Sequence, residues 1–286
     1  MLLSVRVAWL ALAVLAGPAL TSTLEGTSTS VAVVAACLAA VGWGLGVVAV
    51  LVPRSVSLTA LRVLAPLALA GAIACAVRAS SVGVAEGAAL AGCALVTGAV
   101  LLVGVVGDAF VDGSSYGPEK RFALRVPLLL LAGPVKVVWL AAVGPVIVAP
   151  LLLAAKAWAA GIVLIGVGVA VVRPALRSLH QLARRWLVFV PAGVVLHDPL
   201  ALADPVLVPK RMVRSLRLAE VGDEQDAVDV TRNAPGLVIA IDATEAIPVG
   251  LVRGRRQAES IEASRLLLSP VRPGAVLAEA RARSLG

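Results

Sequence analysis

Few residues in this chain are suited to acid–base chemistry, since it has only two histidines, His180 and His197. His197 precedes Asp198, and a neighbouring carboxylate can orient an imidazole as a general base. The pair stands before a proline at the end of an expected strand, and no serine or cysteine lies in a nucleophile motif, so we interpret it as a surface turn. Phosphate-binding loops, HExxH, CxxC and paired carboxylates are also lacking. The sequence therefore predicts no enzymatic activity and no catalytic residues.

The three cysteines, Cys37, Cys75 and Cys93, all fall within long apolar stretches. Their positions do not match the ligand spacing of a metal site, and three cysteines cannot form a disulfide framework. Buried cysteine commonly behaves as a small apolar packing residue. We therefore expect no metal and no cofactor.

Basic side chains gather at two places in the last third of the chain. If they face an anionic membrane, each basic side chain contributes about 1 kcal/mol to the binding of this domain to the membrane surface. The predicted lipid-binding residues are Lys210, Arg211, Arg214, Arg217, Arg253, Arg255 and Arg256. The alternative is that they are solvated charges balanced by the acidic loop at 220–234. Nucleic acid is not an expected partner, because these basic stretches contain no aromatic residues for stacking.

Two Gly-Pro pairs interrupt an apolar stretch and lie eleven residues apart, which is about three helical turns. Both kinks would open on the same face of a helix, as in transporters with broken helices. The candidate hinge residues are Gly133, Pro134, Gly144 and Pro145. The alternative is that neighbouring helices simply tolerate these prolines. The preceding leucines at 128–131 are too few to cross a bilayer, so they predict an interfacial or re-entrant helix.

The elements that hold these residues follow from the composition. Of 286 residues, 60% are hydrophobic and only 15% are charged, whereas a soluble domain has about 45–50% apolar and 25% charged residues. A bilayer core needs about 20 apolar residues per helix. That length predicts six spans, at 3–20, 31–52, 58–77, 87–107, 134–154 and 157–173.

The orientation of these spans follows from the basic residues of the short connectors, because basic connectors stay in the cytoplasm. Most of them lie on one side, namely Arg6, Arg54, Lys120, Arg121 and Arg125, with Arg173, Arg177, Arg184 and Arg185. The opposite side has only Arg78 and Lys156. We therefore expect a multi-pass protein of the cell membrane with both termini in the cytoplasm. Alternatively, the first span is a cleaved signal peptide, which would leave the remaining topology unchanged.

Charge of both signs becomes denser near Arg173, which predicts a change of domain. We expect a transmembrane helical domain at 1–178 and a cytoplasmic domain at 179–286. In the latter, short β-type runs are punctuated by turn residues. They lie at 185–190, 194–197, 205–208, 212–218, 237–241, 247–252 and 265–268. A proline-initiated helix follows from Pro273. The fold class is therefore a polytopic helical membrane domain followed by a small β-rich domain with a C-terminal helix.

This C-terminal third resembles the bacterial PH-like domains that follow transmembrane helices. The resemblance rests on three segments: Arg184-Arg-Trp-Leu-Val-Phe-Val-Pro-Ala-Gly-Val-Val-Leu-His-Asp, Lys210-Arg-Met-Val-Arg-Ser-Leu-Arg-Leu and Ser269-Pro-Val-Arg-Pro-Gly-Ala-Val-Leu-Ala-Glu. It implies a PH-type fold that associates with proteins, with lipids or with its own copies. Phosphoinositide binding is not implied. The membrane half resembles no family that we can name.

Three functional hypotheses follow. The first is a non-enzymatic membrane protein whose helices anchor a cytoplasmic PH-like module that binds membrane lipids, a protein partner or a second copy. The second is a transporter of small solutes or lipids with a kinked fifth helix and a regulatory cytoplasmic domain. No acidic residue lies at the middle of a predicted span, which argues against an ion-coupled transporter. An enzyme built on His197 is the third and weakest hypothesis.

Overall fold

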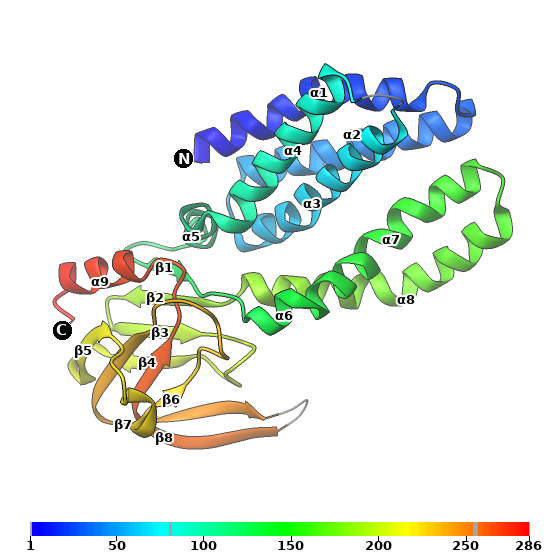
Figure 1. Cartoon of the computed structure of the whole chain (residues 1–286). Helices are drawn as coiled ribbons and strands as arrows, with labels where there is room; N and C mark the ends of the chain where they lie inside the picture. Colours follow the sequence, from blue (N-terminus) through cyan, green and yellow to red (C-terminus); the bar gives the residue numbers. More distant parts are fainter. Residues whose placement is uncertain (1, 80–81, 254–256, 286) are drawn as a thin grey trace. The chain divides into compact units, whose positions relative to one another are not determined.

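The computed structural model describes residues 2–79, 82–253 and 257–285, and the chain forms two compact units. The helical unit comprises residues 1–110 and 136–180, and the β unit comprises residues 111–135 and 181–286. Figure 1 shows the helices of the first unit and the two sheets of the second. The β unit thus contains a segment from the middle of the chain, residues 111–135, most of which the sequence predicts to be a connector between spans.

Six helices of the described chain are long and apolar enough to cross a membrane. They are α1 (Leu2–Leu24), α2 (Thr29–Leu51), α3 (Ser55–Arg78), α4 (Val84–Leu102), α7 (Pro134–Ala154) and α8 (Trp158–Ala183). Each overlaps one predicted span, although the ends differ. The largest differences are at α4, which ends at Leu102, before the separate helix α5 (Gly104–Asp112), and at α8, which continues well past residue 173.

Helices α1 to α4 pack against one another around small side chains. The indole of Trp9 is 2% exposed and lies against Gly46 of α2. Trp9 Nε1 donates to the Trp43 carbonyl at 3.0 Å, and Trp43 Nε1 donates to the Trp9 carbonyl at 3.2 Å. These reciprocal hydrogen bonds satisfy two polar groups that lipid could not, so they fix α1 against α2.

Helices α7 and α8 approach each other where a glycine faces a larger side chain. A methyl group built on Gly168 of α8 would lie 2.8 Å from Pro145 of α7. The pair is linked to the rest of the helical unit by polar contacts: Trp139 Nε1 donates to the Val63 carbonyl at 3.0 Å, and Thr59 Oγ1 lies 2.8 Å from His180 Nδ1. His180 therefore contacts another helix of the unit.

The first sheet of the β unit has the strand order β1-β2-β3-β4. Its strands are β1 (Lys120–Ala123), β2 (Trp186–Val190), β3 (Gly193–His197) and β4 (Val206–Pro209). β1 pairs antiparallel with β2, with Ala123 opposite Trp186. Strands β1 and β2 are therefore adjacent in the sheet, while α6 (Leu128–Ala132), α7 and α8 lie between them in the sequence.

The second sheet has the order β5-β7-β8-β6. Its strands are β5 (Val213–Leu218), β6 (Val228–Asp229), β7 (Ile239–Arg253) and β8 (Gln257–Leu268), and short 3-10 helices occur at Lys210–Met212 (η1) and Asp223–Asp226 (η2). The runs expected at 237–241 and 247–252 form the single strand β7, because a register shift between Asp242 and Ile247 lets the chain bend without leaving the sheet. Helix α9 (Pro273–Ala282) follows.

The core of the β unit lies between the two sheets and beneath α9. Phe122 and Phe189 meet edge to face with ring centroids 5.8 Å apart, so β1 contributes directly to this core. Val276 and Ala280 of α9 are buried in the same cluster. The structure thus confirms six long apolar helices and a β-rich C-terminal region with a terminal helix. It adds two strands that the sequence did not predict: β1, and β6 within the loop expected at 220–234.

Candidate functional site

A buried ion pair lies at the point where the chain enters β2. Arg185 Nε donates to Asp198 Oδ1 at 2.8 Å, and Arg185 Nη2 donates to Oδ2 at 2.7 Å. The two side chains are 1% and 0% exposed. Such a pair is strongly destabilising to break, because the remaining charge stays buried and unpaired. Its role is therefore structural: it fixes the chain at the end of α8.

Arg125 makes the matching contacts where the chain leaves β1. Its backbone N–H donates to the Ser269 carbonyl at 2.8 Å, and its Nε donates to the Pro270 carbonyl at 3.1 Å. Arg185 Nη1 donates in turn to the Arg125 carbonyl. Gly236, at φ 104°, lies so close to the Arg125 guanidinium that a side chain would overlap it. Both points at which the chain leaves and re-enters the sheet are thereby joined.

If His197 were a general base, Asp198 would be expected to bind its imidazole, but in the structure Asp198 binds Arg185. Both of its oxygens accept from Arg185, whereas the His197 imidazole stacks on Trp186 at 4.9 Å between ring centroids. Burial and the nearby Arg184 hold the pKa of His197 below its usual value, which favours the neutral ring. Asp198 is therefore not placed to orient His197 as a general base, as an enzyme built on His197 would require.

The predicted lipid-binding residues fall into three groups in the structure. Lys210 and Arg211 lie on η1, Arg214 lies on β5, and all three are exposed. Lys210 Nζ donates to the Arg283 carbonyl at 2.8 Å. Arg253 ends β7, while Arg255 and Arg256 lie outside the described residues. Lys210, Arg211 and Arg214 are therefore exposed and close in sequence, and their contact with lipid stays a prediction.

Arg217 differs from the other basic residues, because it belongs to a network of two arginines and two aspartates. Its Nη1 lies 2.8 Å from Asp223 Oδ2 and its Nε lies 3.1 Å from Asp242 Oδ2. Arg265 contacts the same two carboxylates, at 2.9 Å from Asp223 and 2.5 Å from Asp242. Arg217 thus ties η2 to the sheet.

Hydrogen bonding sets the ionisation of this network. Donation by Arg217 and by the Glu220 backbone holds the pKa of Asp223 far below its usual value. Partial burial opposes ionisation of Asp242, but hydrogen bonds from Arg265 and Ser215 outweigh it and also lower its pKa. Both carboxylates therefore remain charged down to acidic pH, and the pKa values of both arginines are raised.

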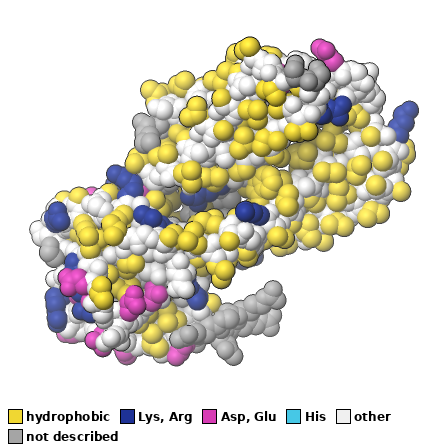
Figure 2. Space-filling view, viewed as in Figure 1, with side chains coloured by type: hydrophobic (Ala, Val, Ile, Leu, Met, Phe, Trp, Pro, Cys, Tyr) yellow, Lys and Arg dark blue, Asp and Glu magenta, His cyan; other side chains and the backbone are white. Residues whose placement is uncertain are grey.

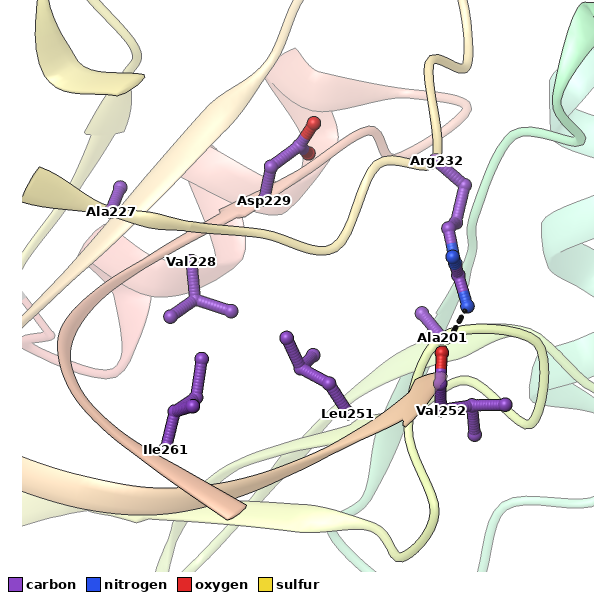
Figure 3. Close-up of a pocket in the computed structure, with 8 residues that line it drawn as sticks. All are labelled: Ala201, Ala227, Val228, Asp229, Arg232, Leu251, Val252 and Ile261. Carbon is purple, nitrogen blue, oxygen red and sulfur yellow. Dashed lines mark hydrogen bonds between the residues drawn. The ribbon is translucent and has the colours of Figure 1, made fainter. Parts of the chain in front are cut away.

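A pocket of about 330 Å³ opens at the distal end of the β7–β8 hairpin. In Figure 3, Val228, Leu251 and Ile261 point into it from three strands, and Arg232 lies at its edge. The Arg232 Nη2 donates to the Leu200 and Val252 carbonyls at 2.8 and 2.9 Å. The volume lies within the range of about 300–1,000 Å³ that is typical of ligand sites. Sequence reasoning missed it, because its apolar residues are separated along the chain and resemble ordinary core positions.

The candidate hinge residues occupy two distinct positions. Gly133 and Pro134 form the boundary between α6 and α7, whereas Gly144 and Pro145 lie inside α7, which is continuous from Pro134 to Ala154. The hinge itself stays a prediction. The expected short helix at 128–131 is present as α6, with exposed leucines on its surface.

The site is thus a β unit with a buried junction, an ion-pair network, a basic surface and an apolar pocket. Within the residues that the structure describes, no group of three or more histidine, cysteine or acidic side chains could hold a metal ion. Comparison of the chain with models of protein families, with curated proteins and with solved structures finds no match.

Proposed function

We propose that this protein is a non-enzymatic, multi-pass membrane protein that holds its β unit at the cytoplasmic membrane surface as a binding module. The observation that carries the proposal is the pairing of β1 with β2, with α7 and α8 inserted between them in sequence. Two residues, Arg184 and Arg185, separate α8 from β2. The β unit is thus connected to the last apolar helix with almost no linker.

The same pairing supports the expected membrane topology. Strands that share a sheet lie on one side of a membrane, so the chain must cross the membrane an even number of times between Ala123 and Trp186. Helices α7 and α8 are long and apolar enough for these two crossings, and α1 to α4 for four more. We propose that all six cross the membrane, so that the N-terminus lies on the side of the β unit. Figure 2 shows hydrophobic side chains over the helices and charged ones gathered on the β unit.

Basic residues support the assignment of that side to the cytoplasm. Lys120 and Arg121 lie in β1 and Arg184 lies between α8 and β2, and basic segments beside spans are retained in the cytoplasm. The observations that support a PH-like module are the eight strands in two sheets and the terminal helix that the described residues form. We propose that Lys210, Arg211 and Arg214 contact anionic lipid, while Arg217 stabilises the fold.

Cysteine labelling tests the topology. In a background without native cysteines, Asp204→Cys marks the exposed surface of the β unit and Glu25→Cys marks the α1–α2 connector on the opposite side. We expect a membrane-impermeant maleimide to label position 204 only in inside-out vesicles and position 25 only in right-side-out cells. Labelling of position 204 from outside would overturn the proposal.

Thermal unfolding tests the lipid contact. Because a ligand that binds only the folded state stabilises it, adding phosphatidylglycerol to detergent-solubilised protein should raise its Tm. The variant with Lys210, Arg211 and Arg214 all changed to Ala should lose this gain. The control Arg281→Ala, at an exposed arginine of α9, should keep it. An equal gain in all three proteins would contradict the proposed lipid surface.

A further inference from the structure

We propose that β8 and the adjacent pocket bind an extended, basic peptide segment of a partner protein, which adds to the second sheet as a strand. This inference rests on the proposed binding function and names the chemistry of the partner. In the order β5-β7-β8-β6, the position beside β8 is filled only by the two residues of β6. β6 pairs with Leu266 and Leu267, and no described strand pairs with β8 on that side between Gln257 and Ser264.

The register shows which main-chain groups of β8 face the open position. Val252 N–H donates to the Ala201 carbonyl, and Ala203 N–H donates to the Gly250 carbonyl, so these β7 residues direct their polar groups away from β8. Gly250 lies opposite Ser260. Because hydrogen-bonded and non-hydrogen-bonded pairs alternate in antiparallel strands, Ser260 directs its N–H and carbonyl away from β7. The same alternation applies to Glu262. An incoming strand can bond to both residues.

The pocket lies where a side chain of that added strand would point. Successive side chains alternate between the faces of a sheet. On β8, Ser260 and Glu262 are exposed, whereas Ile261 between them lies on the inner face and lines the pocket with Leu251 and Val228. Figure 3 shows these three side chains converging on an open space. The space of about 330 Å³ can hold one leucine-, isoleucine- or phenylalanine-sized side chain.

The charge of the described elements beside the open position favours a basic partner. Their exposed acidic residues are Glu224 and Asp226 of η2, Asp229 of β6, and Glu259 and Glu262 of β8. Arg232 is the pocket's basic lining residue, and it donates to two carbonyls of its own chain. A second copy of this chain is disfavoured, because pairing two β8 edges would bring together two surfaces that both carry these acidic residues. A segment with lysine or arginine on either side of an apolar residue would complement this surface.

Panning of a displayed library of random ten-residue peptides on the intact protein in lipid nanodiscs tests the proposal. Ser260→Pro removes the N–H on the open edge while leaving the bonds to β7, and Ser260→Ala is its matched control. We expect selected peptides to carry an apolar residue flanked by lysine or arginine. Their affinity should fall about tenfold for Ser260→Pro, as expected for the loss of one or two main-chain hydrogen bonds, and should be unchanged for Ser260→Ala. Glu262→Lys should also lower the affinity of the protein for the selected peptides.

Three outcomes would overturn the inference. The first is that the library yields no binder. The second is that the selected peptides bind Ser260→Pro and Ser260→Ala equally well. The third is that Ser260→Pro changes the oligomeric state of the protein and leaves peptide binding unchanged. The last would assign the edge to a second copy. None of them affects the labelling of positions 204 and 25, so failure of this inference is distinguishable from failure of the proposed membrane topology.

Discussion

The indole ring of Trp9 occupies the space that a side chain at position 46 would need, so Gly46 is the contact that lets α1 and α2 approach. Gly42, one turn earlier on α2, has only Leu64 near it, at 4.0 Å from a methyl group built there. The two glycines form a GxxxG pair in the sequence, but their surroundings differ.

Gly46→Ala should therefore destabilise the helical unit, because the new methyl group displaces a large, buried and hydrogen-bonded ring. We expect a cost of about 1–3 kcal/mol, which is typical of overpacking. Gly42→Ala should be nearly neutral. Thermal unfolding in mild detergent, followed by tryptophan fluorescence, measures both. Equal stabilities of the two variants would contradict the packing of Trp9 on Gly46.

Asp198→Asn should strongly destabilise the β unit, since it leaves the Arg185 guanidinium buried without its counter-charge. The expected cost is about 3–5 kcal/mol, as for other broken buried pairs. The control Glu279→Gln removes a partly exposed ion pair with Arg283 and should cost less than about 1 kcal/mol. Denaturant unfolding of the intact protein compares them. If Asp198→Asn were as mild as the control, the pair would not support the junction.

Phe122→Ala should destabilise the β unit by about 3–5 kcal/mol, because it removes a buried aromatic side chain that packs on Phe189. Tyr116 lies in the same connector and is 87% exposed, so Tyr116→Ala is a matched control that should change stability little. Limited proteolysis at 111–135 provides a second measurement, and cleavage should increase only for Phe122→Ala. Similar cleavage of both variants would indicate that β1 does not belong to the core.

Acid should weaken the β unit through Asp223 and Asp242. Their pKa values are lowered in the folded state, so their stabilisation is complete above the unfolded value of about 4 and is lost as pH falls through the folded values. Asp223→Asn should therefore flatten the decline of the unfolding midpoint below about pH 4. Asp226→Asn, at an exposed residue of the same turn, should leave the decline unchanged. A decline of wild-type steepness in Asp223→Asn would argue against the network.

The sequence predicts the helices well because each depends on a long local run of apolar residues. The fifth predicted span, 134–154, coincides with α7 from Pro134 to Ala154. In contrast, β1 consists of only Lys120-Arg-Phe-Ala and gains its structure from Trp186 and its neighbours, which are far along the chain. No local pattern could reveal that pairing.

The candidate site was harder to predict than the fold for a related reason. The basic strand at 210–218 was found from its composition, but composition does not reveal that Arg217 is bound by Asp223 and Asp242. The significance of Gly46 was also hidden, because glycine is frequent in this chain and only the position of Trp9 distinguishes one glycine from another. The pocket depends on side chains from three strands, so it exists only after the sheets have formed.

The separation of β1 from β2 constrains how the protein is made. β1 leaves the ribosome about 60 residues before β2, which at typical translation rates is a delay of roughly 3–12 seconds. During that time Phe122 still lacks its partner Phe189. In the proposed topology, a chain in which only one of α7 and α8 crossed the membrane would carry β1 and β2 on opposite sides, where they could not pair. Closure of the first sheet therefore depends on α7 and α8 crossing together or not at all.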